Sequence, residues 1–179
     1  MKEQQKKYEL TGEFIEHWNG KKLYRIKALV TFGAVVAGQL GGFVESEKNL
    51  DQSLSGDAWV SGNARVSGNA QVSGDAWVSG NAQVYGDAQV SGNARVRSYA
   101  VISERKMIFW ASNVGSENGT LTVFNGKDGL IVTRGCFTGT VDEFLAKSAE
   151  VHDDKTKNEY KLLIEVAKSR ISGVKDERN

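Results

Sequence analysis

Residues 55–96 read SGDAWV SGNARV SGNAQV SGDAWV SGNAQV YGDAQV SGNARV, and this stretch decides the fold. The unit is Gly-[Asp/Asn]-Ala-x-Val-[Ser/Tyr], and it recurs every six residues with almost no drift. A fixed short period is typical of solenoids, in which each repeat packs only on its neighbours. The sequence therefore predicts a stacked repeat architecture for the middle of the chain.

Each unit predicts one very short strand and one corner. Ala58 and Val60 lie two positions apart, so both point inward and the residue between them points outward. The Gly-[Asp/Asn] pair favours a turn, because glycine reaches positive φ and Asn or Asp tolerates it. A glycine in every unit would cost an α-helix about 1 kcal/mol each, which excludes a helical solenoid. Three units then form one triangular coil of a parallel β-solenoid, with coils about 4.8 Å apart.

The coil length of eighteen residues sorts the outward side chains into columns. They are Trp59, Trp77 and Arg95 on one side, Arg65, Gln83 and Val101 on the second, and Gln71 and Gln89 on the third. The repeat does not require tryptophan, so the first column stands out. Its arginine is expected to be a cation–π neighbour of the tryptophans.

Exposed aromatic and arginine side chains are enriched at interfaces. The tryptophan column has two readings. It is either a packing surface, against another subunit or the C-terminal helices, or a platform for a base, a nucleotide or a partner side chain. We take as candidate binding residues Trp59, Trp77, Arg65, Arg95 and Tyr85.

An aliphatic residue followed four positions later by a small one recurs at Val60–Ala64 and Val66–Ala70. This pattern resembles the hexapeptide-repeat, left-handed β-helix family. The resemblance implies a left-handed coil and a homotrimer, and many members of that family transfer acyl groups from coenzyme A. A thin core of Ala and Val also favours packing between copies with closed symmetry.

Acyl transfer needs a base within hydrogen-bond reach of the acceptor, and in that family the base is a histidine in or beside the coils. The chain has two histidines, His17 and His152, and both lie outside the repeats. We expect them to be surface or capping residues. Because a fold does not imply a function, an acyltransferase stays an alternative and no catalytic residue is assigned.

Turn formation and burial explain the remaining candidate residues, so no chemical role is assigned to them. The corner column Asp57, Asp75 and Asn93 has oxygen ligands that suit Ca²⁺, but turn formation accounts for these residues, so no metal site is assigned. Cys136 is the only cysteine, which excludes a disulfide framework, and its apolar neighbours predict a small buried residue. No cofactor is expected.

The segment before the repeats predicts a hairpin that caps the first coil. Two β-like runs between Tyr8 and Val30 flank Asn19-Gly20, a strong hairpin signal. Residues 1–7 are charged and expected to be loose. Residues 31–50 read as irregular coils, and a loop in residues 45–53 must reset the frame of the repeats. We therefore divide the chain into a hairpin cap (1–30), β-helix repeats (31–105) and a C-terminal module (106–179).

The C-terminal module predicts antiparallel strands followed by two helices. Turns are expected near Asn118-Gly119 and Asn125-Gly126. A capping box at Thr140–Glu143 begins a helix that extends to about residue 151. A second helix is predicted from about 156 to 171 and ends at Gly173; its apolar face comprises Tyr160, Leu163, Val166, Ala167 and Ile171.

The flanks carry a second resemblance. FGAVVAGQLGGFVESEKNL before the repeats, and GCFTGTVDEFLAKSAEVH with EYKLLIEVAKSRI after them, resemble uncharacterised proteins of phages and prophages. The resemblance implies a bacterial host, and such accessory proteins often act against host defence, by binding a host protein complex or sequestering a nucleotide signal. A net charge of +1 argues against nucleic-acid binding.

The sequence shows no signal peptide and no long apolar run, so the expected location is the host cytoplasm, without a membrane partner. We expect a non-enzymatic binding protein. The alternatives are a hexapeptide-type acyltransferase and a structural component of a virion.

Overall fold

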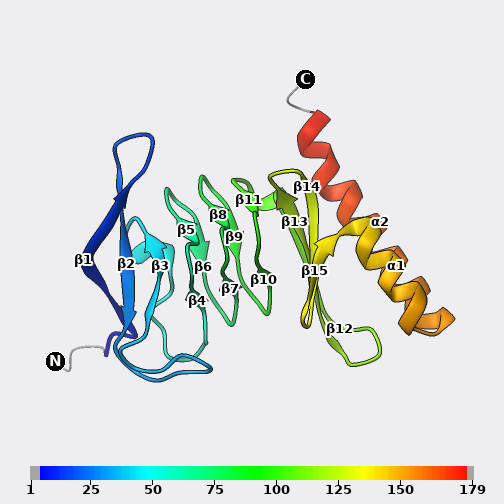
Figure 1. Cartoon of the computed structure of the whole chain (residues 1–179), viewed down its shortest axis with the longest axis horizontal. Helices are drawn as coiled ribbons and strands as arrows, with labels where there is room; N and C mark the ends of the chain where they lie inside the picture. The colour runs from blue at the N-terminus through cyan, green and yellow to red at the C-terminus, as the bar shows by residue number, and fades with distance from the viewer. Residues whose placement is uncertain (1–4, 177–179) are drawn as a thin grey trace.

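The computed structural model describes residues 5–176, with side chains up to Ile171. Three parts follow one another along the long axis (Figure 1). An N-terminal hairpin lies at one end, the coils occupy the middle, and a sheet with two helices forms the other end. None of the described helices is long and apolar enough to cross a membrane.

The repeats form a β-solenoid of about three turns, as predicted. Its strands are β4 (Trp59–Val60), β5 (Arg65–Val66), β6 (Gln71–Val72), β7 (Trp77–Val78), β8 (Gln83–Val84), β9 (Gln89–Val90), β10 (Arg95–Val96) and β11 (Val101–Ile102). Strands of successive coils pair in parallel, with Trp59 beside Trp77 and Trp77 beside Arg95. Arg65, Gln83 and Val101 follow in the same way on the second side. The predicted columns are therefore confirmed.

The inward positions are the core of the solenoid. Every repeat Ala from Ala58 to Ala100 and every Val from Val60 to Val96 is at most 1% exposed. The corner glycines from Gly62 to Gly92 have φ between 59° and 68°, where a side chain would be strained. Ser98 adopts φ 61° at the position where the next repeat glycine would lie. The predictions that Ala and Val point into the core and that the glycines form the corners are both confirmed.

The N-terminal hairpin is also found, and it extends one side of the solenoid. It consists of β1 (Tyr8–Glu16) and β2 (Lys22–Ala28), and β3 (Leu40–Val44) follows. β2 pairs antiparallel with β3, which pairs in parallel with β5, so the sheet order is β1-β2-β3-β5-β8-β11. The hairpin thereby covers the strand edge that the first coil would otherwise expose.

The frame of the repeats is reset after Leu50, slightly later than predicted. Val44 pairs with Val66, and Leu50 forms a bridge with Val72. The partners in these two pairs are equally far apart along the chain, by four residues more than the length of one coil. The extra residues lie in the segment 51–57. The short helix η1 (Glu47–Asn49) forms a corner inside the frame, and Asn49 donates from Nδ2 to the Ala70 carbonyl at 2.9 Å.

The expectation that residues 1–7 are loose is wrong for Lys7, while residues 1–4 lie outside the described part of the chain. Lys7 is fully buried, and its Nζ donates to the Gly56 carbonyl at 3.2 Å. The ammonium also lies 4.5 Å from the centre of the Phe32 ring. Burial lowers the pKa of Lys7, and the carboxylates of Asp51 and Asp57 oppose the shift.

After the short helix η2 (Arg105–Met107), an antiparallel sheet closes the far end of the solenoid. Its strands are β12 (Ile108–Val114), β13 (Gly119–Gly126), β14 (Gly129–Arg134) and β15 (Phe137–Thr140). The last strand was not predicted. The second turn lies at 127–128, two residues beyond the predicted Asn125-Gly126. Asn125 instead donates from Nδ2 to the Val101 carbonyl of the last coil, at 3.0 Å.

The two helices are α1 (Val141–Val151) and α2 (Asp154–Asp176), and they cover the face of the sheet that is turned away from the coils (Figure 1). The predicted capping box is confirmed, because Thr140 Oγ1 accepts from the Glu143 amide at 3.1 Å. The predicted end at Gly173 is wrong, since α2 continues to Asp176.

The buried face of α2 differs from the predicted one. It consists of Tyr160, Ile164, Ala167 and Ile171, whereas Leu163 is only partly buried and Val166 is 53% exposed. The spacing of the buried residues follows the helical period more closely than the predicted set did. The helices therefore pack on the sheet, not on the tryptophan column.

Candidate functional site

The tryptophan column is not an open surface. Trp59 is 0% exposed, and its ring packs edge-on against Tyr8 and Phe32, with ring centres 6.4 and 5.4 Å apart. The proposed role of Trp59 as an exposed contact residue is therefore wrong. The covering residues lie far away in sequence, so the repeat period could not reveal them.

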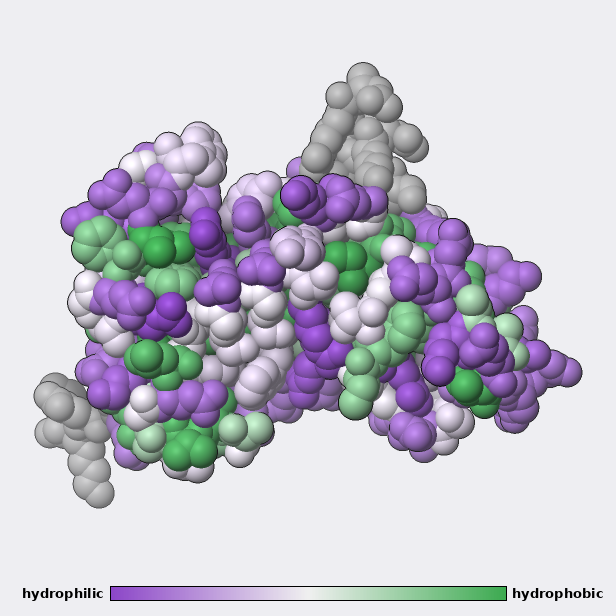
Figure 2. Space-filling view, in the orientation of Figure 1, coloured by the Kyte–Doolittle hydropathy of each residue, from purple (hydrophilic) through white to green (hydrophobic). Residues whose placement is uncertain are grey.

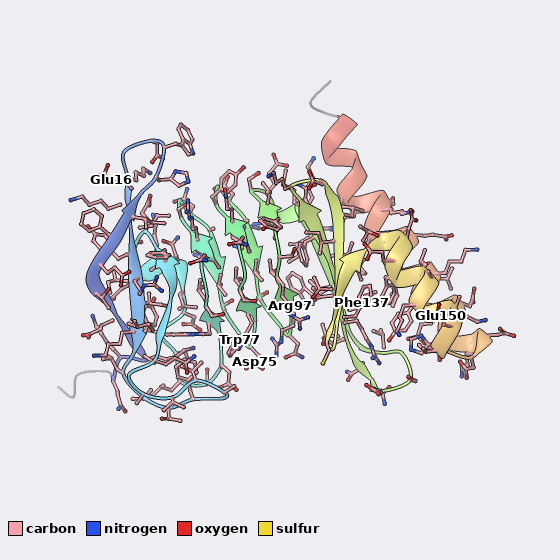
Figure 3. All side chains as sticks on the ribbon, viewed as in Figure 1. Glu16, Asp75, Trp77, Arg97, Phe137 and Glu150 are labelled. Carbon is pink, nitrogen blue, oxygen red and sulfur yellow. The ribbon has the colours of Figure 1, made fainter. Side chains whose placement is uncertain are left out.

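Trp77 and Arg95 are half-buried, and each is bonded to the preceding coil. Trp77 Nε1 donates to the Asp57 carbonyl at 3.1 Å, and Arg95 Nη1 donates to the Asp75 carbonyl at 2.6 Å. Figure 3 shows Trp77 close to Asp75 at this edge of the coils. The two side chains connect adjacent coils, and this hydrogen bond of Arg95 takes the place of the predicted cation–π contact.

A pocket of about 240 Å³ lies between the turn of the N-terminal hairpin and the corners of two coils. In Figure 2 it corresponds to the notch between the protruding hairpin and the solenoid. We call it the hairpin site; the residues that define it are His17, Trp18, Lys21, Glu45 and Tyr85. Tyr85 is thus the one predicted contact residue that lies here.

The hairpin turn holds Trp18 away from the body of the protein. The Gly20 amide donates to the His17 carbonyl at 2.8 Å, and Gly20 has φ 82°. Asn19 Oδ1 accepts from the Lys21 amide at 3.0 Å. Trp18 is consequently 88% exposed, and its ring lies 5.6 Å from that of His17. Trp18 is not among the residues predicted from the sequence, although the Asn-Gly signal places it at the tip of the turn.

The opposite wall of the hairpin site comes from the solenoid. Tyr85 is 38% exposed and is the only tyrosine at the position where the units of residues 55–96 have serine. Lys21 Nζ lies 3.3 Å from Glu45 Oε1, and the Glu45 side chain is 18% exposed. The site therefore combines two accessible aromatic rings with a balanced ion pair.

The other predicted residues lie elsewhere. Arg65 is half-buried in the column between Phe43 and Gln83, outside the hairpin site. Arg95 lines a separate pocket of about 330 Å³, where the last coil meets the C-terminal sheet. The structure adds Arg97 and Arg134 to that pocket. Neither was predicted from the sequence, because they come from parts of the chain that only the fold brings together.

The histidines lie far apart, on the hairpin and at the end of α1 (Figure 1). His152 Nδ1 is 2.9 Å from Ser148 Oγ, and its ring lies 5.3 Å from that of Tyr160, in agreement with a capping role. His17 lines the hairpin site.

The prediction that Cys136 is buried is wrong. This residue is exposed in the turn between β14 and β15. Among residues 5–171, whose side chains the structure describes, no group of three or more His, Cys, Asp or Glu side chains could hold a metal ion.

The coils resemble a known class of repeat. A family model described as the YdcK beta solenoid repeat matches residues 58–72, 70–86 and 88–104. Fold and match together define this chain as a repeat β-helix protein. The matched segments coincide with the coils, while the hairpin, the C-terminal sheet and the helices lie outside them. No curated protein matches the chain.

Proposed function

We propose that this protein is a non-enzymatic binding protein that recognises a protein partner through the hairpin site. The observation that carries the proposal is the 88% exposure of Trp18 on a fixed turn, next to a pocket that Tyr85 also lines. Tryptophan and tyrosine dominate binding hot spots because they bury a large area with few rotatable bonds.

The charge of the site also favours a protein partner. Lys21 and Glu45 compensate each other at 3.3 Å, so this pocket has no excess positive charge that would attract a polyanion. An aromatic core with polar groups at its rim is the usual composition of a protein interface. A rigid solenoid behind Tyr85 keeps the entropic cost of binding low.

The proposal also includes the biological setting of the protein, which is a bacterial host infected by a phage or carrying a prophage. The resemblance of the flanks to phage and prophage proteins supports a role in the cytoplasm of a bacterial host, as a counter-defence protein that binds a host complex. The hexapeptide-like spacing supports a left-handed coil and a homotrimer. Because the N-terminal segment covers Trp59, the trimer contact would use another face. Native mass spectrometry should give three times the 19.5 kDa chain, and a monomer would contradict the trimer.

Affinity capture from a bacterial lysate tests the binding role. The bait is the full chain, and the variants are Trp18→Ala and Tyr99→Ala. Tyr99 is an aromatic residue 55% exposed outside the hairpin site, so it is a matched control. We expect one host protein to be retained by the wild type and by Tyr99→Ala and lost by Trp18→Ala. Equal retention by all three would contradict the proposal.

An acyltransferase is the second candidate, since His17 lines the hairpin site. A pocket of about 240 Å³ is smaller than the usual 300–1,000 Å³ of small-molecule sites, which favours the binding role. Turnover of acetyl-coenzyme A that His17→Ala abolishes would overturn our preference. A virion component, the third candidate, would copurify with phage particles.

A further inference from the structure

A second site lies at the opposite end of the solenoid, between the last coil and the C-terminal sheet. Arg95 and Arg97 from the coil and Arg134 from β14 line one pocket of about 330 Å³, which we call the arginine pocket. We propose that the arginine pocket binds a small phosphorylated ligand through its phosphate group. This inference is independent of the hairpin site.

Neutral groups hold the two arginines of the coil. Arg95 Nη1 donates to the Asp75 carbonyl at 2.6 Å. Arg97 Nη2 donates to the Gly135 carbonyl at 2.8 Å, and Arg97 Nη1 donates to Thr138 Oγ1 at 3.1 Å. In Figure 3, Arg97 lies at the boundary of the coils, toward Phe137. Carbonyl and hydroxyl groups orient the guanidinium groups without cancelling their charge, so the site is preorganised for an anion.

Arg134 adds a third charge that is only partly compensated. Its side chain is 16% exposed, and the guanidinium lies 5.9 Å from the centre of the Tyr160 ring, which offsets part of its burial. Nε and Nη2 are buried and donate no hydrogen bond within the part of the chain whose side chains the structure describes. Nη1 lies 3.5 Å from Glu117 Oε2, but the Glu117 side chain is 79% exposed. Burying an unpaired donor is costly, and it is costlier for a charged group. An anion in the pocket would offset part of this cost.

The lining of the pocket has three positive groups and one carboxylate, that of Glu117. Asn93 and Thr120 also line it and can contribute neutral polar groups. A hydrophilic band follows this boundary on the surface (Figure 2). Burial lowers the pKa of Arg97, and the nearby charge of Arg95 lowers it further, which agrees with a positive potential in the pocket.

The ligand class follows from this geometry. The planar guanidinium fork of arginine matches two oxygens of a phosphate, and three such groups suit an anion with more than one charge. A simple carboxylate needs only one arginine. The volume is at the lower end of the range for small-molecule sites, which fits a compact phosphate-bearing molecule.

Calorimetric titration with inorganic pyrophosphate and inorganic phosphate, at constant ionic strength, tests the proposal. The variants are Arg95→Gln and Arg65→Gln. Both arginines belong to identical SGNARV units, residues 61–66 and 91–96, but only Arg95 lines the pocket. We expect saturable binding, weakened about tenfold or more by Arg95→Gln and unchanged by Arg65→Gln. Circular dichroism of both variants checks that they are folded.

Glu117→Gln supplies a second variant on an exposed side chain, which should not disturb folding. Removal of this carboxylate frees Arg134, so binding of pyrophosphate should become tighter, by about threefold. No binding by the wild type, or equal weakening by Arg95→Gln and Arg65→Gln, would overturn the proposal. Acetate binding as tight as that of phosphate would overturn the choice of phosphate.

Discussion

Thr133 Oγ1 donates a hydrogen bond to the carbonyl of Arg95 at 2.7 Å, across the boundary between the solenoid and the C-terminal sheet. Thr122, paired with Thr133 across β13 and β14, accepts from the Arg95 amide at 3.1 Å. A further coil would normally pair with these two backbone groups of β10. The threonines therefore end the stack where another chain could otherwise add a strand.

Thr133→Val tests this end contact, because valine keeps the shape and removes the hydroxyl. The Arg95 carbonyl would be left unpaired in a buried setting, and we expect a loss of about 1–3 kcal/mol in the free energy of unfolding. Thr120→Val is the control, since the Thr120 hydroxyl is hydrogen-bonded to Ser112 Oγ, at 3.1 Å, and not to a group of the last coil. Urea denaturation measures both. Equal stability of Thr133→Val and the wild type would show that the hydroxyl does not cap the stack.

The contacts between the solenoid and the segments that flank it could not be predicted from the sequence. The six-residue period predicts strands, columns, core and corners, because each depends on local geometry. The burial of Trp59 by Tyr8 and Phe32 depends on segments outside the repeats. The meeting of Arg97 with Arg134 depends likewise on how the C-terminal sheet docks. Periodicity contains no information about either contact, so both candidate pockets came only from the structure.

Trp59 and Trp77 lie in register, but we expect them to respond differently to mutation. Trp59→Ala should cost about 3–5 kcal/mol, because it removes a fully buried aromatic ring between two others. Trp77→Ala removes a half-buried ring and one hydrogen bond, so its cost should be clearly smaller. Chemical denaturation of both variants checks the order. A larger loss for Trp77→Ala would contradict the packing role of Trp59.

Val78→Asp should prevent folding. Val78 is 0% exposed inside the coil, and an unpaired carboxylate there would cost several kcal/mol, comparable to the whole stability of a domain. Gln83→Asp places the same group on the exposed outer face and should change stability by about 0.5 kcal/mol or less. A melting curve of Val78→Asp like that of the wild type would refute the inward assignment.

Tyr8 should make the fold sensitive to alkali. Its hydroxyl donates to the Leu50 carbonyl at 2.5 Å, and burial raises its pKa well above the ordinary value of 10.0. The folded protein keeps this proton when the unfolded chain has lost it. Stability from this group is therefore complete below pH 10.0 and falls as the pH rises further.

The measurement is denaturation at several pH values from 8 to 11 (roughly bracketing the tyrosine pKa) for the wild type and Tyr8→Phe. We expect the variant to be less stable near neutral pH and to show a shallower alkaline loss. Parallel curves for the two proteins would mean that Tyr8 is not the group responsible.

The most direct test of the proposed function is the affinity of the captured host protein for the wild type, Trp18→Ala and Tyr99→Ala, measured by calorimetry. We expect Trp18→Ala to raise the dissociation constant about tenfold or more, and Tyr99→Ala to leave it unchanged. Equal affinity of the wild type and Trp18→Ala would contradict recognition through the hairpin site.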